Sequence, residues 1–238
     1  MRRKSKRNRH HPVLFTICIL ALIASVGFIQ LHPSPVAVEE SNLILVNKQY
    51  RLPEDYVPSD LVKVGINFPD STPSERRQMR AEAALALEQM EAAMKEEGLA
   101  LIGVSGYRSF STQQSLYRRR LSEAGAAHVS QYNAEAGASE HQTGLAMDVA
   151  AEGKSVLTEA FADTDEYHWL ALNAHRYGFI IRYPEGMEDE TGYLFEPWHM
   201  RYVGDAAADL YESKLTMEAF MRLHFPSLDF VRGRNAPN

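Results

Sequence analysis

One segment of the chain, residues 139–148, combines a histidine and a carboxylate with an apolar stretch. His141 lies in its polar first half, and Asp148 interrupts the apolar run that follows a glycine. Burying an unpaired carboxylate is costly, so Asp148 needs a partner, and a bound cation is one way to stabilise it. Pairing with a buried arginine or with backbone amides is the alternative that this segment leaves open.

A second segment, residues 195–202, places Glu196 three residues before His199. Pro197 lies between them and cannot donate a ladder hydrogen bond, so we predict that no regular central strand joins the two residues. Both side chains could then face one cleft, where a carboxylate and an imidazole would act together.

Taken together, the two segments offer two histidines and one carboxylate, namely His141, Asp148 and His199. Such a set is typical of an open catalytic zinc site, which keeps a fourth position for water. Glu196 could then take the proton from that water as it attacks a carbonyl. A single histidine is more often a surface or core residue than a ligand, so the spacing alone leaves this a hypothesis. Seven histidines receive no role: His10, His11, His32, His128, His168, His175 and His224.

The elements that must position these residues alternate irregularly between helix and strand. We expect short strands at 43–46, 99–104, 145–150 and 179–183, and helices at 72–98, 111–125, 164–177 and 205–224. The absence of regular βαβ alternation favours an α+β domain with a small, mostly antiparallel sheet flanked by helices.

The first of these helices has the clearest start signal. Residues 72–75 read Thr-Pro-Ser-Glu, which supplies a capping threonine, proline at the first helical position and glutamate three residues after the cap. We expect this helix to run to Gly98 and to pack through four apolar side chains, Leu85, Leu87, Met90 and Met94.

The N-terminal part of the chain reads as a membrane anchor. An uncharged apolar run from residue 13 to about 31 is long enough to cross a bilayer. A cleaved signal peptide usually has a shorter apolar core, so we favour an uncleaved signal-anchor. The basic residues before it should stay in the cytoplasm. The expected order is a basic cytoplasmic segment at 1–12, a transmembrane helix at 13–31, a stalk at 32–41 and an extracytoplasmic domain at 42–238.

Charge and cysteine content exclude several functions. Without the six basic residues of the N-terminal flank, 19 basic residues face 31 acidic ones, a net charge of −12. An acidic domain of this kind argues against nucleic-acid binding. Cys18 is the only cysteine and lies in the apolar run, so the expected soluble domain has no disulfide, thiol nucleophile or thiolate zinc ligand.

Three segments resemble the VanY-type D-alanyl-D-alanine carboxypeptidases in order and spacing. They are Ser-Gly-Tyr-Arg-Ser at 105–109, the segment 139–148, and Glu-Pro-Trp-His-Met-Arg-Tyr-Val-Gly at 196–204. The similarity covers nearly all of the expected soluble domain. One departure is Glu-Ala-Gly at 135–137, where many relatives carry Arg-Pro-Gly.

The resemblance implies a zinc DD-peptidase (hedgehog-like) fold and a zinc enzyme that removes the C-terminal D-alanine of peptidoglycan stem peptides. It assigns Zn²⁺ to His141, Asp148 and His199, the catalytic base to Glu196, and stabilisation of substrate and oxyanion to Arg108. It further suggests substrate contacts at Gln113, Ser139, Tyr183 and Trp198. We expect the chain to act as a monomer.

Three other functions remain to be weighed. An L,D-carboxypeptidase that trims tetrapeptide stems would use the same catalytic groups. A wall-binding module that keeps the metal only as a structural element is a second alternative, although it would not need a base and an arginine. A serine peptidase of the penicillin-binding type is disfavoured, because no serine is followed three residues later by lysine and no Lys-Thr-Gly is present.

Overall fold

The structure is a computed structural model that describes residues 41–124, 129, 131–153 and 157–226. The predicted cytoplasmic segment and transmembrane anchor, and all but the last residue of the predicted stalk, lie outside the described residues. Within the described residues, no helix has both the length and the apolar character needed to span a membrane.

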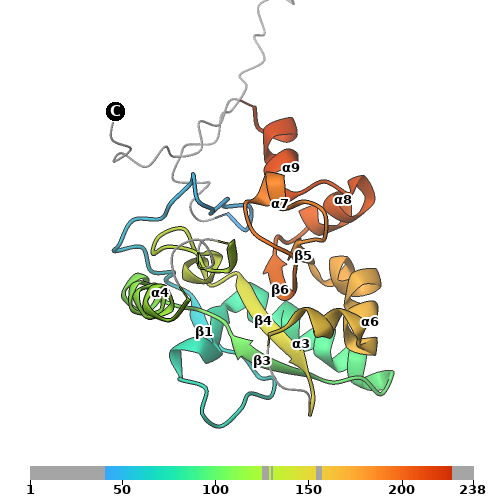
Figure 1. Cartoon of the computed structure of the whole chain (residues 1–238). Helices are drawn as coiled ribbons and strands as arrows, with labels where there is room; N and C mark the ends of the chain where they lie inside the picture. Colours follow the sequence, from blue (N-terminus) through green and yellow to red (C-terminus); the bar gives the residue numbers. More distant parts are fainter. Residues whose placement is uncertain (1–40, 125–128, 130, 154–156, 227–238) are drawn as a thin grey trace, which may run out of the picture. The chain divides into compact units, whose positions relative to one another are not determined.

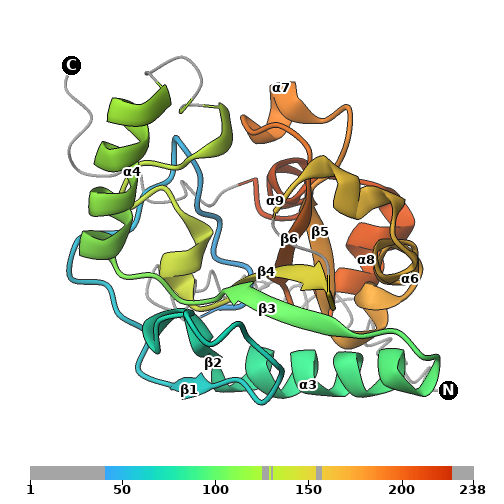
Figure 2. The same cartoon turned by 60° about the horizontal axis from the view of Figure 1, so that its bottom comes forward.

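Four antiparallel strands form the central sheet, in the order β3-β4-β6-β5. The two inner strands, β4 and β6, are buried along their whole length. A separate pair, β1 and β2, forms a short second sheet; β1 is labelled in Figure 1, and both strands are labelled in Figure 2. The bounds are β1 Leu61–Lys63, β2 Gln78–Arg80, β3 Leu101–Ser105, β4 Ala146–Ala151, β5 Phe179–Tyr183 and β6 Glu196–Tyr202. The prediction of an α+β domain with a small antiparallel sheet is confirmed.

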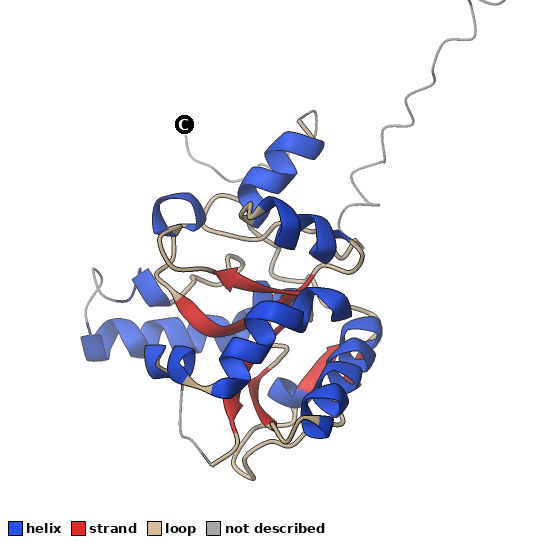
Figure 3. Cartoon of the chain, turned by 90° about the vertical axis from the view of Figure 1, so that its right-hand side faces the viewer, coloured by secondary structure: helices blue, strands red, loops and turns tan. Residues whose placement is uncertain are grey.

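Helices lie on either side of the strands (Figure 3). In Figure 2, α3 runs along one face of the sheet beneath β3 and β4, and its buried side chains belong to the same core cluster as those of the sheet. The α-helices are α3 Ala81–Glu96, α4 Phe110–Ala124, α6 Asp165–Asn173, α7 Glu188–Thr191, α8 Ala206–Ser213 and α9 Met217–His224. The structure also describes four short 3₁₀ helices: η1 Glu75–Arg77, η2 Glu140–Thr143, η3 Glu159–Asp163 and η4 Ala174–Tyr177.

The start predicted for the first long helix is wrong. Residues 72–75 lead only into η1, the chain then forms β2, and α3 begins at Ala81. Tertiary pairing overrides the local capping signal here, because β2 pairs with β1 and the Arg80 amide donates to the carbonyl of Gly144 at 2.8 Å. Leu85, expected in the core, is 57% exposed, whereas the other three predicted core side chains of this helix are buried.

Two further predictions of local structure are corrected. Residues 43–46 form no strand, although Ile44, Leu45 and Val46 are buried. Pro197 does lie inside a central strand, β6, contrary to the prediction. It is accommodated because the pairing of β6 with β5 is irregular there: Met200 pairs with Ile181, but Glu196 pairs with Tyr183.

A glycine closes the turn that carries His141. Gly144 has φ +69°, and a Cβ atom at this position would lie 2.9 Å from a methyl carbon of Leu61 and 3.2 Å from the backbone nitrogen of Arg80. Gly153 has a similar φ of +72°, but among the described residues no atom lies within 4 Å of the point that a Cβ atom would occupy there. Comparing substitutions at the two glycines therefore separates the cost of a left-handed backbone from the cost of crowding by neighbouring atoms.

We expect Gly144→Ala to lower the free energy of unfolding more than Gly153→Ala does. Left-handed backbone costs each alanine about 1–2 kcal/mol, and only the first variant adds a collision with the backbone of Arg80. Urea denaturation of both variants measures the difference. Equal losses would mean that the turn before β4 has room for a methyl group.

Candidate active site

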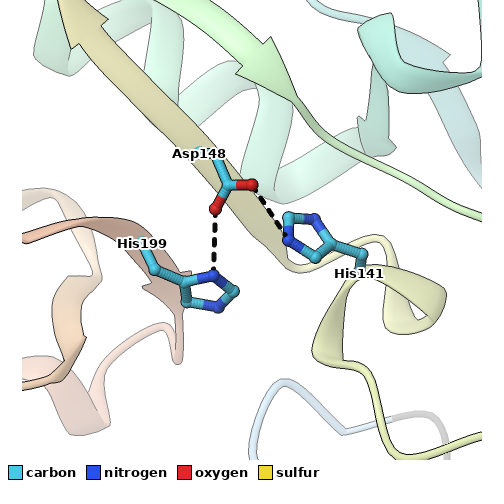
Figure 4. A group of neighbouring side chains, drawn as sticks. All are labelled: His141, Asp148 and His199. Carbon is cyan, nitrogen blue, oxygen red and sulfur yellow. Dashed lines mark hydrogen bonds and ion pairs between the residues drawn. The ribbon is translucent and has the colours of Figure 1, made fainter. Parts of the chain in front are cut away.

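The sheet register brings two of the predicted metal ligands face to face. Asp148 on β4 and His199 on β6 are directly paired across the antiparallel strands, a position where side chains on one face lie within contact distance. His141 reaches the same point from η2, which precedes β4. Figure 4 shows the three side chains converging.

The distances suit a single cation. Asp148 Oδ1 lies 3.0 Å from His199 Nδ1, and Asp148 Oδ2 lies 3.2 Å from His141 Nε2. One ligand atom from each residue falls within 4.8 Å of the others, and all three residues are buried. Tetrahedral zinc with bonds of about 2.0–2.1 Å holds its ligand atoms about 3.3 Å apart. Two imidazoles and one carboxylate at these spacings therefore fit zinc.

The second nitrogen of each imidazole has its own acceptor. His141 Nδ1 lies 2.8 Å from the carbonyl oxygen of Gly106, and His199 Nε2 lies 3.3 Å from Glu140 Oε2. These contacts orient both rings so that His141 Nε2 and His199 Nδ1 face Asp148.

Electrostatics around the three ligands favours a cation. Burial alone would raise the pKa of Asp148, but the two histidines outweigh it and hold this pKa well below its usual range. Burial lowers the pKa of His141. Burial also opposes charge on His199, yet hydrogen bonds to Asp148 and Glu140 raise its pKa to about 9. A site that attracts a proton this strongly between two carboxylates would also attract a metal cation, which takes the proton's place.

Glu196 lies at the start of β6, beside the metal ligands. Its Oε2 is 3.9 Å from His199 Nδ1, and the residue is 7% exposed. Burial raises the pKa of Glu196 to about 8, against the opposing effects of His199 and Arg108. A carboxylate with a raised pKa in this position suits proton transfer near neutral pH.

Arg108 follows β3 and lies beside Asp148, with Nη2 4.0 Å from Asp148 Oδ2. Its Nη1 donates to Gln113 Oε1 at 2.5 Å and its Nη2 to Ser105 Oγ at 2.9 Å. Burial lowers the pKa of Arg108 to about 10, so the guanidinium stays charged at neutral pH. Among the described residues its buried Nε has no hydrogen-bond partner, and the side chain lines the same cleft as the metal ligands.

A cleft of about 550 Å³ contains all nine predicted site residues. Besides the ligands, Glu196 and Arg108, its walls include Ser139, Tyr183, Trp198 and Gln113. The amide of Gln113 is already engaged, since it accepts from Arg108 and donates to the carbonyl of Ala134 at 2.5 Å. Gln113 thus holds Arg108 in place, and direct substrate contact by Gln113 stays a prediction.

The prediction missed several polar residues at the site. Tyr193 lines the cleft, and its buried hydroxyl has no hydrogen-bond partner among the described residues. Glu140 and two arginines, Arg182 and Arg201, form a buried ionic cluster behind His199. A signal existed for the arginines, because each interrupts the apolar residues of a strand and therefore needs a partner.

Comparisons with known proteins agree with this geometry. A family model described as "VanY: D-alanyl-D-alanine carboxypeptidase" matches residues 76–205. The protein YodJ of Bacillus subtilis (strain 168) is 46% identical over 183 residues, which cover 76% of this chain and 67% of YodJ.

Two solved structures extend the likeness to three dimensions. The LdcB LD-carboxypeptidase, whose structure concerns peptidoglycan recognition, has a TM-score of 0.73 at 45% identity, covering 77% of this chain and 87% of that chain. A mutant of the vancomycin resistance D,D-pentapeptidase VanY in complex with Zn(II) has a TM-score of 0.63 at 32% identity, covering 76% of this chain and 98% of that chain.

Proposed function

The chain belongs to the VanY family of D-alanyl-D-alanine carboxypeptidases, and on this premise we propose that it is a zinc-dependent carboxypeptidase that removes the C-terminal D-alanine of peptidoglycan stem peptides. One observation carries the proposal: two imidazoles and a carboxylate converge in one cleft with a buried second carboxylate and a buried arginine. A wall-binding module would need neither Glu196 nor Arg108 beside its metal.

His141, Asp148 and His199 would hold the zinc ion. When bound, zinc supplies a Lewis acid that polarises the scissile carbonyl and makes water easier to deprotonate. The donors fit this role, since all three residues line the cleft that would receive the peptide.

The chain's own residues transfer the proton and stabilise the negative charge that develops on the carbonyl oxygen. Glu196 removes a proton from the attacking water and returns it to the amino group of the departing D-alanine. Arg108 donates to the carbonyl oxygen as negative charge develops there. The C–N bond breaks, the water oxygen becomes part of the new carboxylate, and free D-alanine leaves. Ser139, Tyr183 and Trp198 would contact the peptide end, with Trp198 also forming a wall because it packs into the core.

An L,D-carboxypeptidase is a second candidate, because the LdcB LD-carboxypeptidase shares 45% identity and a TM-score of 0.73 with this chain. Both reactions release D-alanine, but from stems of different length. A D,D-enzyme cleaves a pentapeptide ending in D-Ala-D-Ala, whereas an L,D-enzyme cleaves a tetrapeptide ending in one D-alanine.

We expect the full-length chain, purified in detergent, to release D-alanine from the pentapeptide and to leave the tetrapeptide intact. A chelator should abolish the release, because removing zinc removes the Lewis acid that polarises the carbonyl and activates the water. Added zinc should restore the release. Mass spectrometry of both peptides, with a β-lactam as a control that should not inhibit, identifies the bond cleaved. Release from the tetrapeptide alone would favour the L,D-enzyme, and release that survives the chelator would contradict a metal enzyme.

We also propose that residues 13–31 anchor the chain in the cell membrane and that the enzyme acts outside the cytoplasm as a monomer. An uncharged apolar run behind six basic residues supports the anchor and its orientation. The full-length chain should sediment with membranes and resist extraction by salt, while detergent should release it. Fractionation beside a chain that starts at residue 32 tests this, since recovery of the full-length chain in the soluble fraction would contradict the anchor.

A further inference from the structure

A buried carboxylate that the proposed mechanism does not use lies behind the metal ligands. Glu140 is 1% exposed, and although it is next to His141 in the sequence, its side chain reaches His199 instead. Its Oε2 lies 3.3 Å from His199 Nε2, on the side of the ring away from Asp148. The contact therefore places an acceptor behind a ligand.

Two arginines fix the orientation of this carboxylate. Arg182 Nε and Arg201 Nη1 each donate to Glu140 Oε1 at 2.7 Å, which leaves Oε2 to the histidine. Both guanidinium groups are fully enclosed and are themselves held. Arg182 makes a bidentate pair with Glu218, and Arg201 donates to the carbonyl of Ile44 at 2.7 Å. Glu140 cannot turn without breaking charge-assisted hydrogen bonds inside the protein.

An ionised carboxylate is only an acceptor, so the imidazole nitrogen that faces it must carry the proton. For His199 this holds at Nε2, which faces Glu140, and also at Nδ1, which faces Asp148 while no metal is bound. A metal bound between Nδ1 and Asp148 would take the place of the Nδ1 proton, so the remaining proton stays on Nε2. The carbonyl of Gly106 selects the complementary tautomer of His141 in the same way. Each ligand histidine thus has a fixed acceptor behind it.

We infer that Glu140 is a positioning residue that holds His199 as the tautomer with a proton on Nε2 and a free Nδ1 for the metal. The inference rests on the proposed zinc function. It goes beyond that function because it assigns part of the metal affinity to a residue that touches neither the metal nor the substrate.

Glu140→Gln is the direct test. The arginines would hold the amide oxygen in place of Oε1, so the NH₂ group would face His199 Nε2 and favour the wrong tautomer. We expect zinc affinity, measured by competition with a chromogenic chelator, to fall about 10- to 100-fold. The ligand-field spectrum of the cobalt-substituted protein should also change, because the ring of His199 is no longer fixed.

Glu218→Gln is the matched control. Glu218 is 5% exposed and pairs with the same Arg182, but it makes no contact with His199. Its replacement also disturbs the ionic cluster, through Arg182, and should leave zinc affinity and the cobalt spectrum as in the wild type. Circular dichroism of the metal-free variants separates loss of folding from loss of affinity.

A measurement on the wild-type protein keeps the inference testable even if Glu140→Gln does not fold. Long-range ¹H–¹⁵N NMR of the zinc-loaded chain should show the proton of His199 on Nε2. A proton on Nδ1, or equal zinc affinities for the two variants, would overturn the role of Glu140 while leaving the zinc enzyme intact. A wild-type chain that binds no zinc would overturn the proposed function as well.

Discussion

Replacing Glu196 by glutamine should lower kcat by about 10²- to 10⁴-fold, the usual contribution of a general base, while zinc content stays unchanged. The amide keeps the shape of the side chain but cannot accept a proton. In the wild-type chain the carboxylate of Glu196 lies 3.9 Å from Nδ1 of His199, so it does not hold the three metal ligands in place. Steady-state release of D-alanine and metal analysis of the same preparation measure the two quantities.

The pH profile gives an independent check on Glu196. The base acts as a carboxylate, so the rate should fall as the pH decreases through its pKa. Burial raises that pKa to about 8 in the metal-free chain, and a nearby cation lowers it, so the acidic limb should lie below pH 8. The residual activity of Glu196→Gln should lack this limb. Glu96→Gln, at the exposed end of α3, serves as a control that should keep both rate and profile. Full activity in Glu196→Gln would require another base.

Replacing Arg108 by alanine should lower kcat by about 10²- to 10³-fold, as found when an oxyanion donor is removed. The guanidinium lies beside Asp148 and lines the cleft, so its loss removes positive charge that would stabilise the oxyanion of the transition state. KM should change less than kcat, because the interaction strengthens as charge develops on the carbonyl oxygen.

Arg108→Lys should recover only part of the activity. An ammonium group keeps the charge but cannot reproduce the planar fork that holds Gln113 and Ser105. Arg118→Gln, on the exposed side of α4, controls for loss of positive charge near the cleft and should behave as the wild type. A large rise in KM with an unchanged kcat in Arg108→Ala would assign Arg108 to ground-state binding instead.

Local sequence patterns predicted the fold class and three of the six described strands, β3, β4 and β5, because apolar runs and glycine stops are encoded within a few residues. The strand at Phe179–Tyr183 was predicted with its observed ends, since Gly178 stops the preceding helical turns with φ +78°. The start of α3 was not predictable in this way. Its first turn is displaced by pairing with β1 and with the Gly144 loop, contacts between residues far apart in sequence.

In the candidate site, too, some residues could be predicted from the local sequence, whereas others depend on contacts that form only in the folded chain. Residue types and spacing indicated His141, Asp148 and His199 as ligands, but the resemblance to a family, rather than the spacing, made the set specific. The direct pairing of Asp148 with His199 depends on a strand register that no local pattern encodes. Glu140 was missed because its partners, Arg182 and Arg201, come from two later strands that only the folded chain brings together.

The position of Asp148 and His199 on the two central strands links zinc to the lifetime of the folded chain. Any motion that separates β4 from β6 also separates Asp148 from His199, so the sheet cannot open there while a cation is shared between them. Bound metal therefore suppresses the partly opened forms that proteases attack. Scarcity of zinc would then remove the enzyme by degradation as well as by loss of turnover, and the supply of the metal would set how much of the protein persists.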